Sequence, residues 1–387
     1  MRSRVPAWTC VVAMLIAACG GSEAATTTTA PTPATSSTTI TAAPTTTTTQ
    51  AADRLPTFIE KWSETTEQGV VLVVAPADGE PHPYAAGFAD PEVGTAITPD
   101  DLFYIGSITK PVVSTVVMQL VDEGLVDLDA TVDTYLPDVL PGESVTVRDV
   151  LSHQSGVFDF TLLPDFASAL AVDPFQEITP QEVTDAALER DRLRAPGQLF
   201  SYSNTNYLIA GFIVEAVTGN SLAEELESRV YSPLGIEEMR FAGQEGRSVV
   251  NGFADFDGDF QLEATEPFLD STTYTVAWGA GGLAATASEL ATFAAGAFGG
   301  TLLSADSIAT MTSVAASEYT GEGYGLGVLV GSLRGEPVWG HGGAIPGYTS
   351  QFYYFPADGL VLVALSNGEK ASVAGFLEAA AGIVREG

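Results

Sequence analysis

The sequence of 387 residues contains only two cysteines, Cys10 and Cys19, and both lie close to the N-terminus. A signal peptide that ends before Cys19 would carry Cys10 away, so the mature chain would keep a single cysteine. This shortage excludes an internal disulfide. About 335 residues follow the N-terminal segments, which is enough for a large core with more than one layer.

Basic side chains are also scarce. The chain has 15 lysines and arginines against 49 aspartates and glutamates, and its formal net charge is −34. Such an acidic surface argues against nucleic acid and other anionic polymers as partners. Only three of the basic residues are lysines, namely Lys61, Lys110 and Lys370. A lysine inside a short chemical motif is therefore conspicuous in this chain.

Two further signatures are missing. The sequence has no Gly-x-Ser-x-Gly nucleophile elbow, so a Ser-His-Asp triad is a weak alternative, and we predict a structural role for His153 at a helix end. The segment 255–259 resembles a fragment of a calcium loop, but its glycine comes too early and the ligating glutamate is absent. We therefore predict no metal and no cofactor.

The first residues have the features of a secretory signal. Arg2 and Arg4 precede an apolar core at 11–18, which is too short to span a membrane. Ile16-Ala17-Ala18-Cys19-Gly20 resembles the lipobox of bacterial lipoproteins, in which the cysteine becomes the lipidated first residue. The sequence thus predicts a signal peptide at 1–18, lipidation of Cys19, and an extracytoplasmic protein anchored to the cell membrane.

A low-complexity segment rich in threonine, proline and alanine follows the predicted anchor. Such a composition cannot bury a core and is typical of an extended tether, which we place at 19–53. The remaining residues, 54–387, are predicted to form the functional domain.

A serine and a lysine stand three residues apart in Ser107-Ile108-Thr109-Lys110. On a helix this spacing places both side chains on one face, where the lysine can take the proton of the serine hydroxyl. An amine with a free pKa of about 10.4 is protonated, so the site must bury Lys110 to favour the neutral form. Taken alone, the tetrapeptide also fits a solvated helix face.

Apolar residues flank this tetrapeptide on both sides. The segment 103–106 precedes Ser107, and the long apolar run 111–121 follows it and ends before Gly124. The pattern predicts a buried helix that begins near Ser107 and stops at Gly124. Unpaired backbone N–H groups at the start of the helix would stabilise a developing oxyanion.

A second polar motif, Tyr202-Ser203-Asn204, ends a turn-rich stretch and is followed by the apolar helical pattern 208–217. We expect Tyr202 to serve proton transfer, because a phenol near an ammonium ionises more easily than in water. The amide of Asn204 would hold Lys110 or a substrate carbonyl. Asn204 also fits a helix N-cap, and both roles can hold together.

The third motif, Trp339-Gly340-His341-Gly342-Gly343-Ala344, lies among apolar runs near 324–330, 351–355 and 360–365. These runs predict adjacent antiparallel strands. The glycines at 342 and 343 would let a substrate backbone approach the strand edge closely. His341 either brings a positive charge or a hydrogen bond to the site, or is a structural hydrogen-bonding residue.

These three motifs, in this order, resemble the serine β-lactamase and D-alanyl-D-alanine carboxypeptidase superfamily, in the branch of class C β-lactamases, related penicillin-binding proteins and esterases. The resemblance covers roughly residues 54 to 385. Further matching segments are 125–129, 147–156, 231–236 and 279–283.

An α/β (α+β) fold of the β-lactamase/transpeptidase type is expected, with an antiparallel sheet flanked by helices and a mostly helical lobe. The strands 70–74 and 84–88 would join those near 324–366 in one sheet, on which the final helix, 371–385, would pack. Residues from about 130 to 275 would form the lobe. The site would lie in the cleft where Ser107, Tyr202 and His341 meet.

The resemblance also implies residue roles. Ser107 would be the acylated nucleophile, Lys110 its partner base, and Tyr202 the group that carries protons to the leaving atom and to the hydrolytic water. Backbone N–H groups of Ser107 and Ala344 would form the oxyanion hole. Which of Lys110 and Tyr202 is the acylation base stays open. The expected substrate-binding and oxyanion residues are Asn204, His341, Gly343 and Ala344.

The third motif departs from the family pattern. Many relatives carry Lys-Thr-Gly or His-Thr-Gly there, whereas Gly342 and Ala344 have no hydroxyl. Each absent hydrogen bond to a charged group forgoes about 1.5 to 3 kcal/mol of recognition. Tight binding of a substrate carboxylate would need another group, for which Arg334 is a candidate. Esters and amides without a free carboxylate therefore stay in contention.

We predict a serine hydrolase that forms an acyl-Ser107 intermediate, in first place a D-alanyl-D-alanine carboxypeptidase or β-lactamase-like amide hydrolase of the cell envelope. Its substrate would be a small peptide, a β-lactam or an ester. The alternatives are a carboxylesterase of the same fold and a non-catalytic envelope-binding protein, whose signature would be loss of Ser107 or Lys110. The natural substrate, the deacylation rate and the oligomeric state stay open.

Overall fold

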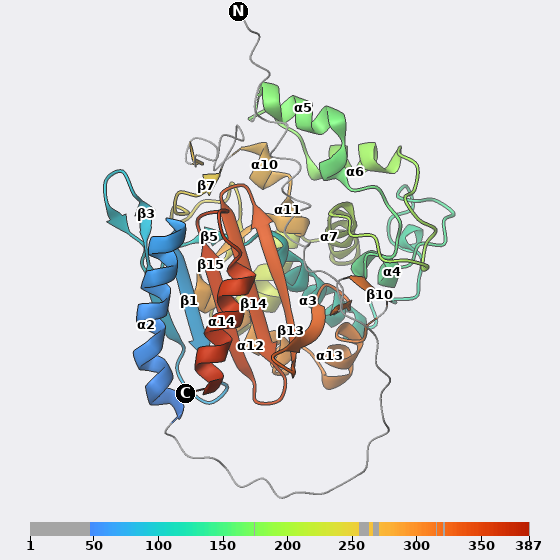
Figure 1. The fold of residues 1–387 in the computed structure, drawn as a ribbon. Helices are drawn as coiled ribbons and strands as arrows, with labels where there is room; N and C mark the ends of the chain where they lie inside the picture. The colour runs from blue at the N-terminus through green and yellow to red at the C-terminus, as the bar shows by residue number, and fades with distance from the viewer. Residues whose placement is uncertain are drawn as a thin grey trace, which may run out of the picture.

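The computed structural model describes residues 47–173, 175–254, 263–265, 271–314, 316–319 and 322–386. The predicted signal peptide, Cys19, most of the predicted tether and the acidic segment 255–259 lie outside these residues. In the described chain, helices cover both faces of an antiparallel sheet and a mostly helical lobe lies beside it, as predicted (Figure 1).

The largest sheet has eight antiparallel strands in the order β10-β11-β12-β13-β14-β15-β1-β2. The two chain ends meet in it because β1 pairs with β15, with Val70 opposite Ser366. β1 has the sequence VVLVVA and is buried along its whole length, as β-branched strands are when both sheet faces are covered. The strands are β1 (Val70–Ala75), β2 (His82–Ala86), β10 (Ala316–Tyr319), β11 (Glu322–Tyr324), β12 (Leu329–Leu333), β13 (Glu336–Ile345), β14 (Tyr348–Phe355) and β15 (Leu360–Ser366).

The second predicted strand, 84–88, is divided in the structure. β2 ends at Ala86, and Gly87 follows with a φ of 87°. Phe88 then begins β3 (Phe88–Asp90), which pairs with β4 (Thr95–Ala96) instead of β1. The left-handed conformation of Gly87 turns the chain away from the large sheet, and glycine adopts it without steric cost.

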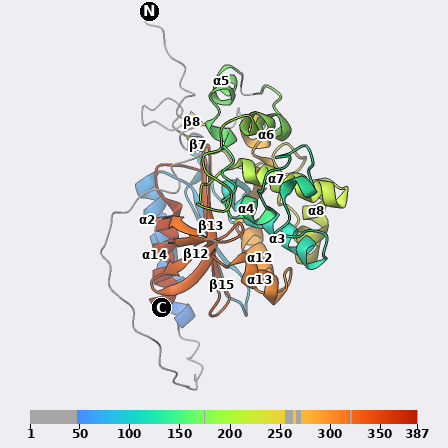
Figure 2. The ribbon, with the colours of Figure 1, turned by 90° about the vertical axis from the view of Figure 1, so that its right-hand side faces the viewer.

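Two helices, α2 (Thr47–Thr66) and α14 (Val373–Glu386), cover one face of the sheet (Figure 1 and Figure 2). α14 is the predicted final helix. The sequence does not predict α2, whose first residues belong to the segment assigned to the extended tether. Leu55 and Ile59 explain the difference: both are buried against the sheet, and each such burial stabilises the fold by about 1.5–3 kcal/mol.

The opposite face carries α3 (Thr109–Asp122) and α12 (Ala287–Phe298), and the predicted helical lobe lies beyond them (Figure 2). Four helices begin with reciprocal capping boxes, at Thr146, Thr179, Ser221 and Thr286. The remaining helices are α4 (Val147–Leu151), α5 (Pro164–Val172), α6 (Pro180–Leu188), α7 (Thr205–Thr218), α8 (Leu222–Leu226), α9 (Ser232–Leu234), α10 (Thr272–Thr275), α11 (Trp278–Gly281) and α13 (Ala305–Met311). Smaller sheets join β5 (Phe103–Tyr104), β9 (Leu283–Ala285) and β6 (Arg240–Phe241), and β7 (Phe253–Ala254) with β8 (Glu263–Ala264).

Candidate active site

Ser107 lies in the 3-10 turn η2 (Gly106–Ile108), between the short strand β5 and α3. The backbone N–H of Ile105 donates to the carbonyl of Leu283 at 2.9 Å and so fixes the entry to the turn. Gly106 then takes a φ of 51°, in the left-handed region that favours glycine. Ser107 thus stands at the start of a buried helix, and this helix ends shortly before Gly124, as the sequence predicts.

Lys110 is completely buried on the first turn of α3. Its Nζ lies 2.9 Å from Ser107 Oγ, 2.8 Å from Asn204 Oδ1 and 2.6 Å from the carbonyl oxygen of Ala280. The oxygens of Asn204 and Ala280 can only accept, so they take two N–H groups of the amine. In a neutral lysine the remaining tetrahedral position is the lone pair, which is then directed at Ser107. This arrangement suits Lys110 to take the proton of the serine hydroxyl.

Tyr202 and Asn204 complete the group around Ser107. The hydroxyl of Tyr202 donates to Ser107 Oγ at 2.9 Å, and Lys110 Nζ lies 4.9 Å from the centre of the Tyr202 ring. Asn204 occupies the position before α7, but its side chain caps no backbone N–H of that helix. It contacts Lys110 on one side and the buried Asp159 on the other. Of the two roles predicted for Asn204, the structure therefore shows the contact with Lys110.

Strand β13 passes directly beside the turn that carries Ser107. A Cβ on Gly343 would overlap the carbonyl oxygen of Ile105, and a Cβ on Gly106 would lie 2.8 Å from the backbone nitrogen of Ala344. Glycine at both positions permits this close approach. Gly343 thus faces η2. Ala344 lines the same cavity as Ser107, and its part in an oxyanion hole stays a prediction.

His341 is buried on β13. Its Nδ1 lies 2.6 Å from the carbonyl oxygen of Gly342, and its Nε2 lies 3.0 Å from the hydroxyl of Tyr324. Because a carbonyl only accepts, Nδ1 carries the proton and Nε2 accepts from Tyr324. Burial, assisted by the charge of Lys110, lowers the pKa of His341 to about 3. The prediction that His341 brings a positive charge is therefore wrong, whereas its hydrogen-bonding role agrees with the structure.

His153 packs behind Tyr202, with ring centres 4.2 Å apart. Its Nδ1 accepts the backbone N–H of Ser203 at 3.2 Å and lies 3.1 Å from Asn206 Nδ2. Within the described residues, Ser107 bonds to Lys110 and Tyr202 and to neither buried histidine. The structure thus gives His153 the structural role predicted for it and provides no Ser-His-Asp triad.

The stability of the fold should fall as the pH is lowered from 7.5 to 5. An unfolded imidazole titrates near pH 6.5, whereas the pKa of His341 in the fold is about 3, and burial lowers that of His153 well below its usual value. Below pH 6.5 the two histidines are therefore protonated in the unfolded chain but stay neutral in the folded chain. Proton binding then favours the unfolded chain, so the free energy of unfolding decreases as the pH falls below 6.5. For two histidines we expect the free energy of unfolding, measured by urea denaturation, to drop by about 4 kcal/mol.

A matched pair of variants assigns this pH dependence. His341→Gln removes one buried imidazole and should reduce the loss between pH 7.5 and 5 to about half. His82→Gln alters an exposed histidine and should leave the loss unchanged. An equal pH dependence in the two variants would contradict the assignment.

A narrow cavity of about 40 Å³ opens beside Ser107. The described residues that line it carry no charge. They are Gly106, Ser107, Phe160, Thr161, Phe166, Leu170, Asn204, Thr273, Val276, Ala277, Ala280, Gly281, Ala344 and Ile345. The space next to the nucleophile is therefore suited to an uncharged and largely apolar group.

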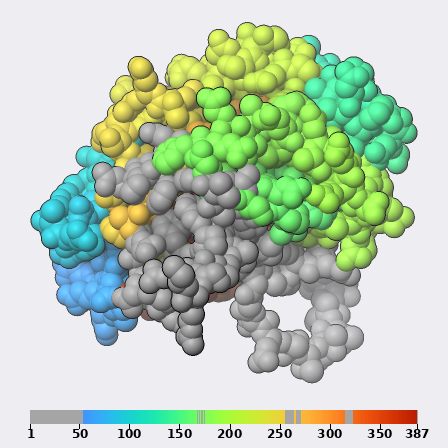
Figure 3. Space-filling model, turned by 90° about the horizontal axis from the view of Figure 1, so that it is seen from above, coloured from blue at the N-terminus to red at the C-terminus, as the bar shows by residue number. Residues whose placement is uncertain are grey.

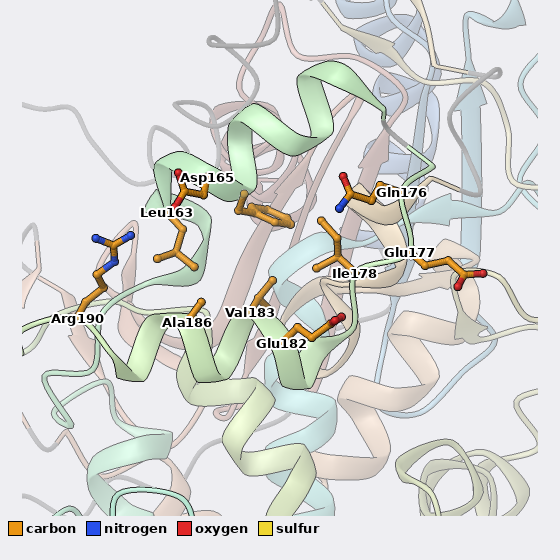
Figure 4. A pocket seen from close by; sticks show the side chains of 10 residues that line it. Leu163, Asp165, Gln176, Glu177, Ile178, Glu182, Val183, Ala186 and Arg190 are labelled. Carbon is orange, nitrogen blue, oxygen red and sulfur yellow. The ribbon is translucent and has the colours of Figure 1, made fainter.

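A second hollow, of about 260 Å³, lies between α5 and α6, where side chains of the two helices face one another (Figure 4). Phe166 of α5 lines both this hollow and the cavity at Ser107. The green residues of α5 are seen on the surface of the lobe from above (Figure 3).

Arg334 does not compensate for the hydroxyls missing from the third motif. Its guanidinium pairs with Glu386 of α14 at 3.0 Å, beside the turn between β12 and β13. Ala344 stands eight positions beyond Glu336 on β13, which corresponds to roughly 26 Å along a strand. The candidate carboxylate partner is therefore at the wrong end of the strand.

In the part of the chain that the structure describes, no group of three or more histidine, cysteine, aspartate or glutamate residues could hold a metal ion. The calcium-like segment 255–259 lies outside that part.

Two groups at the site are not predicted from the sequence. The carbonyl of Ala280 accepts from Lys110, and Asp159 accepts from Asn204. Ala280 belongs to a segment that matches the family, but a backbone carbonyl leaves no mark in a sequence. Asp159 stands among many aspartates of an acidic chain, and no local pattern singles it out.

The fold and the site define a serine hydrolase with a lysine and a tyrosine at its nucleophile. Residues 57–383 match the family model described as Beta-lactamase, and the chain belongs to this family. It is 30% identical to penicillin-binding protein 4 of Amycolatopsis lactamdurans over 333 residues, which cover 78% of this chain and 81% of that relative. The match to a D-aminopeptidase of Brucella anthropi is 28% identical and covers 74% of this chain but just over half, 53%, of the relative.

Solved structures agree with this assignment. A D-stereospecific amidohydrolase from a Streptomyces species superposes with a TM-score of 0.73 at 26% identity, covering 86% of this chain and 97% of that protein. The D-amino acid amidase from Ochrobactrum anthropi SV3 superposes with a TM-score of 0.77 and covers 87% of this chain and 99% of that one, but at 23% identity it shows the fold alone. The chain is therefore an enzyme, a serine hydrolase of the β-lactamase fold.

Proposed function

We propose that the protein hydrolyses amide bonds of small peptide-like substrates through an acyl-Ser107 intermediate. One observation carries the proposal: the buried Lys110 Nζ lies 2.9 Å from Ser107 Oγ, and the hydroxyl of Tyr202 lies 2.9 Å from the same oxygen. A serine so placed has a base for its proton and a second group that can donate one.

The reaction would proceed in balanced steps. Ser107 Oγ bonds to the substrate carbonyl carbon as its proton passes to Lys110, and the amides of Ser107 and Ala344 bind the oxyanion. Tyr202 gives its proton to the leaving nitrogen, the carbon–nitrogen bond breaks, and Lys110 returns a proton to Tyr202. A water molecule then releases the acyl group by the same steps in reverse.

The lining of the cavity favours a neutral group next to the scissile bond. None of its described residues is charged, and Arg334 is bound to Glu386 elsewhere. A carboxypeptidase must hold a substrate carboxylate there, whereas an amidase, an aminopeptidase or an esterase need not. The relatives named D-aminopeptidase and D-stereospecific amidohydrolase support an amide next to a D-residue. We therefore place D-amino acid amides and peptides before the carboxypeptidase and β-lactamase substrates.

Intact-mass spectrometry of the wild-type protein and of Ser107→Ala tests the proposal. Both are mixed with D- and L-amino acid amides, a D-Ala-D-Ala peptide, a fluorescent penicillin and an activated ester. We expect a mass adduct on the wild type alone, and faster turnover of the D-amide than of the peptide that ends in a carboxylate. Faster turnover of that peptide would restore the carboxypeptidase, and absence of any adduct or turnover would refute an acyl-serine enzyme.

We also propose that the protein is held at the outer side of the cell membrane through a lipid on Cys19. The lipobox-like segment 16–20 and the threonine-rich stretch after it support this location. No helix of the described residues has the length and apolar character to cross a bilayer. Fractionation should find wild type and Cys10→Ser with the membranes and Cys19→Ser in the soluble fraction. Retention of Cys19→Ser in the membranes would refute the anchor.

A further inference from the structure

Asp159 is a buried carboxylate that the proposed chemistry does not use. Its residue is 4% exposed, and it stands directly before the 3-10 turn η4 (Phe160–Leu162). Burying a carboxylate is costly unless its oxygens accept hydrogen bonds. The partners of this side chain therefore indicate why it is kept inside the lobe.

Both oxygens of Asp159 accept hydrogen bonds. Oδ1 accepts from the backbone N–H of Thr161 at 3.0 Å and from the Thr161 hydroxyl at 2.9 Å. Oδ2 accepts from Nδ2 of Asn204 at 3.0 Å. Thr161 thus fixes the carboxylate in place, and the carboxylate in turn contacts an asparagine that touches Lys110.

The contact determines which way the amide of Asn204 faces. A carboxylate accepts only, so Asn204 must turn its NH₂ group to Asp159 and its Oδ1 to Lys110. In the reverse orientation the NH₂ group would face Lys110 and donate to the lone pair of the neutral amine. The lone pair would then be withdrawn from Ser107, and the serine proton would have no acceptor.

The negative charge of Asp159 also favours the transfer of the Ser107 proton to Lys110. When Lys110 takes the proton of Ser107 it becomes a buried cation, and the groups of Ser107, Asn204 and Ala280 within hydrogen-bond distance of it are uncharged. The carboxylate of Asp159 is linked to it through a single amide. Burial raises the pKa of Asp159, and the hydrogen bonds from Thr161 together with the charge of Lys110 oppose that rise.

We propose that Asp159 is a positioning residue of the active site, which holds the amide of Asn204 so that the lone pair of Lys110 stays on Ser107. This inference rests on the acylation of Ser107 proposed above. It assigns no contact with the substrate to Asp159, so its removal should alter the rate of the chemical step rather than the binding of the substrate.

Two variants of the mature chain test the inference. In Asp159→Asn the new side chain keeps its oxygen for Thr161 and turns an NH₂ group toward Asn204, which must then reverse. Glu225→Gln, the matched control, alters a carboxylate of α8 that is equally buried but bonds to Asn220 and Arg229.

The kinetic readout uses the acyl donor that the wild type turns over fastest. We expect Asp159→Asn to lose at least tenfold in kcat with KM within threefold of wild type. Glu225→Gln should stay within threefold of wild type in both constants. A smaller loss of kcat in Asp159→Asn, an equal loss in Glu225→Gln, or a change in KM alone would overturn the positioning role and leave only a structural one.

A second readout does not depend on turnover. The mature chain has three lysines, so the ¹³Cε resonance of Lys110 can be identified by its absence from Lys110→Met and titrated. Tyr202, Tyr207, His153 and His341 face Lys110 and are unchanged in Asp159→Asn. The Lys110 midpoint should fall by half a pH unit or more in this variant.

The two readouts separate the two proposals. A midpoint that moves by less than about 0.2 unit together with unchanged kcat would refute the link between Asp159 and Lys110. If none of the acyl donors acylates the wild type and the Lys110 midpoint still shifts in Asp159→Asn, the proposed function would be refuted. The link between Asp159 and Lys110 would still hold.

Discussion

A Lys110→Met variant is expected to acylate Ser107 about a thousandfold more slowly than the wild type, since general-base assistance contributes about 10²–10⁴ and the other group that bonds to the serine hydroxyl, the phenol of Tyr202, donates to it. Methionine has a similar length and no lone pair that can take the proton. Stopped-flow or mass-resolved measurement of acyl-enzyme formation, with an excess of the preferred donor, gives the rate.

The fold itself should tolerate this substitution. The loss of the amine leaves the oxygens of Asn204 and Ala280 without their donor, at a cost of about 1–3 kcal/mol each, so the variant should stay folded but unfold at a lower midpoint. Lys370→Met is the matched control, because Lys370 pairs with Glu67 at the surface, away from Ser107. A Lys110→Met rate within tenfold of wild type would show that another group, with Tyr202 the first candidate, is the acylation base.

Tyr202→Phe is expected to slow the hydrolysis of amides much more than the hydrolysis of activated esters. The leaving nitrogen of an amide must be protonated as the bond breaks, whereas a nitrophenolate leaves without a proton. Loss of the hydroxyl that lies 2.9 Å from Ser107 Oγ should therefore lower kcat/KM for an amide by about 10²–10³ and for a nitrophenyl ester of the same acyl group much less. The ratio of the two kcat/KM values is the measurement.

Tyr207→Phe provides the comparison for this experiment. The centre of the Tyr207 ring lies 5.6 Å from Lys110 Nζ, but the hydroxyl of Tyr207 bonds to the carbonyl of Leu151 and to the hydroxyl of Ser114. This variant should lose about 1 kcal/mol of stability and keep the wild-type ratio of amide to ester turnover. A parallel loss on amide and ester in Tyr202→Phe would assign that residue to the attack on the carbonyl instead of the departure of the amine.

The parts of the site that could be predicted are those that depend on local spacing. Ser107 and Lys110 lie on one turn of helix, so their contact follows from a separation of three residues. Likewise, the apolar runs predict strands near the third motif. Their assembly with β1 into one sheet came from the family resemblance, because sequence alone does not state which strands pair over hundreds of residues.

What could not be predicted depends on the environment created by folding. The charge of His341 is lost through burial, which no neighbouring residue in the sequence reveals. Arg334 is ten residues from Ala344 in sequence. Because most of the residues between them form the extended strand β13, the two residues lie at opposite ends of that strand. Helix α2 was not predicted either: Leu55 and Ile59 are buried against a face of the sheet, and the composition of the segment does not reveal that contact.

The pairing of β1 with β15 determines when, during synthesis of the chain, the large sheet can form. The backbone N–H of Gly69 donates to the side chain of Asn367, 298 residues later, so strand β1 cannot pair with its neighbour until that part of the chain has been synthesised. Closing a loop of this length costs about 5 kcal/mol of chain entropy, whereas the helices of the lobe form mostly from nearby residues. Ala344 also emerges late. A nascent chain on the ribosome would therefore carry Ser107 before its predicted oxyanion partner, and hydrolytic activity would begin only after the strands β13 to β15 have been synthesised.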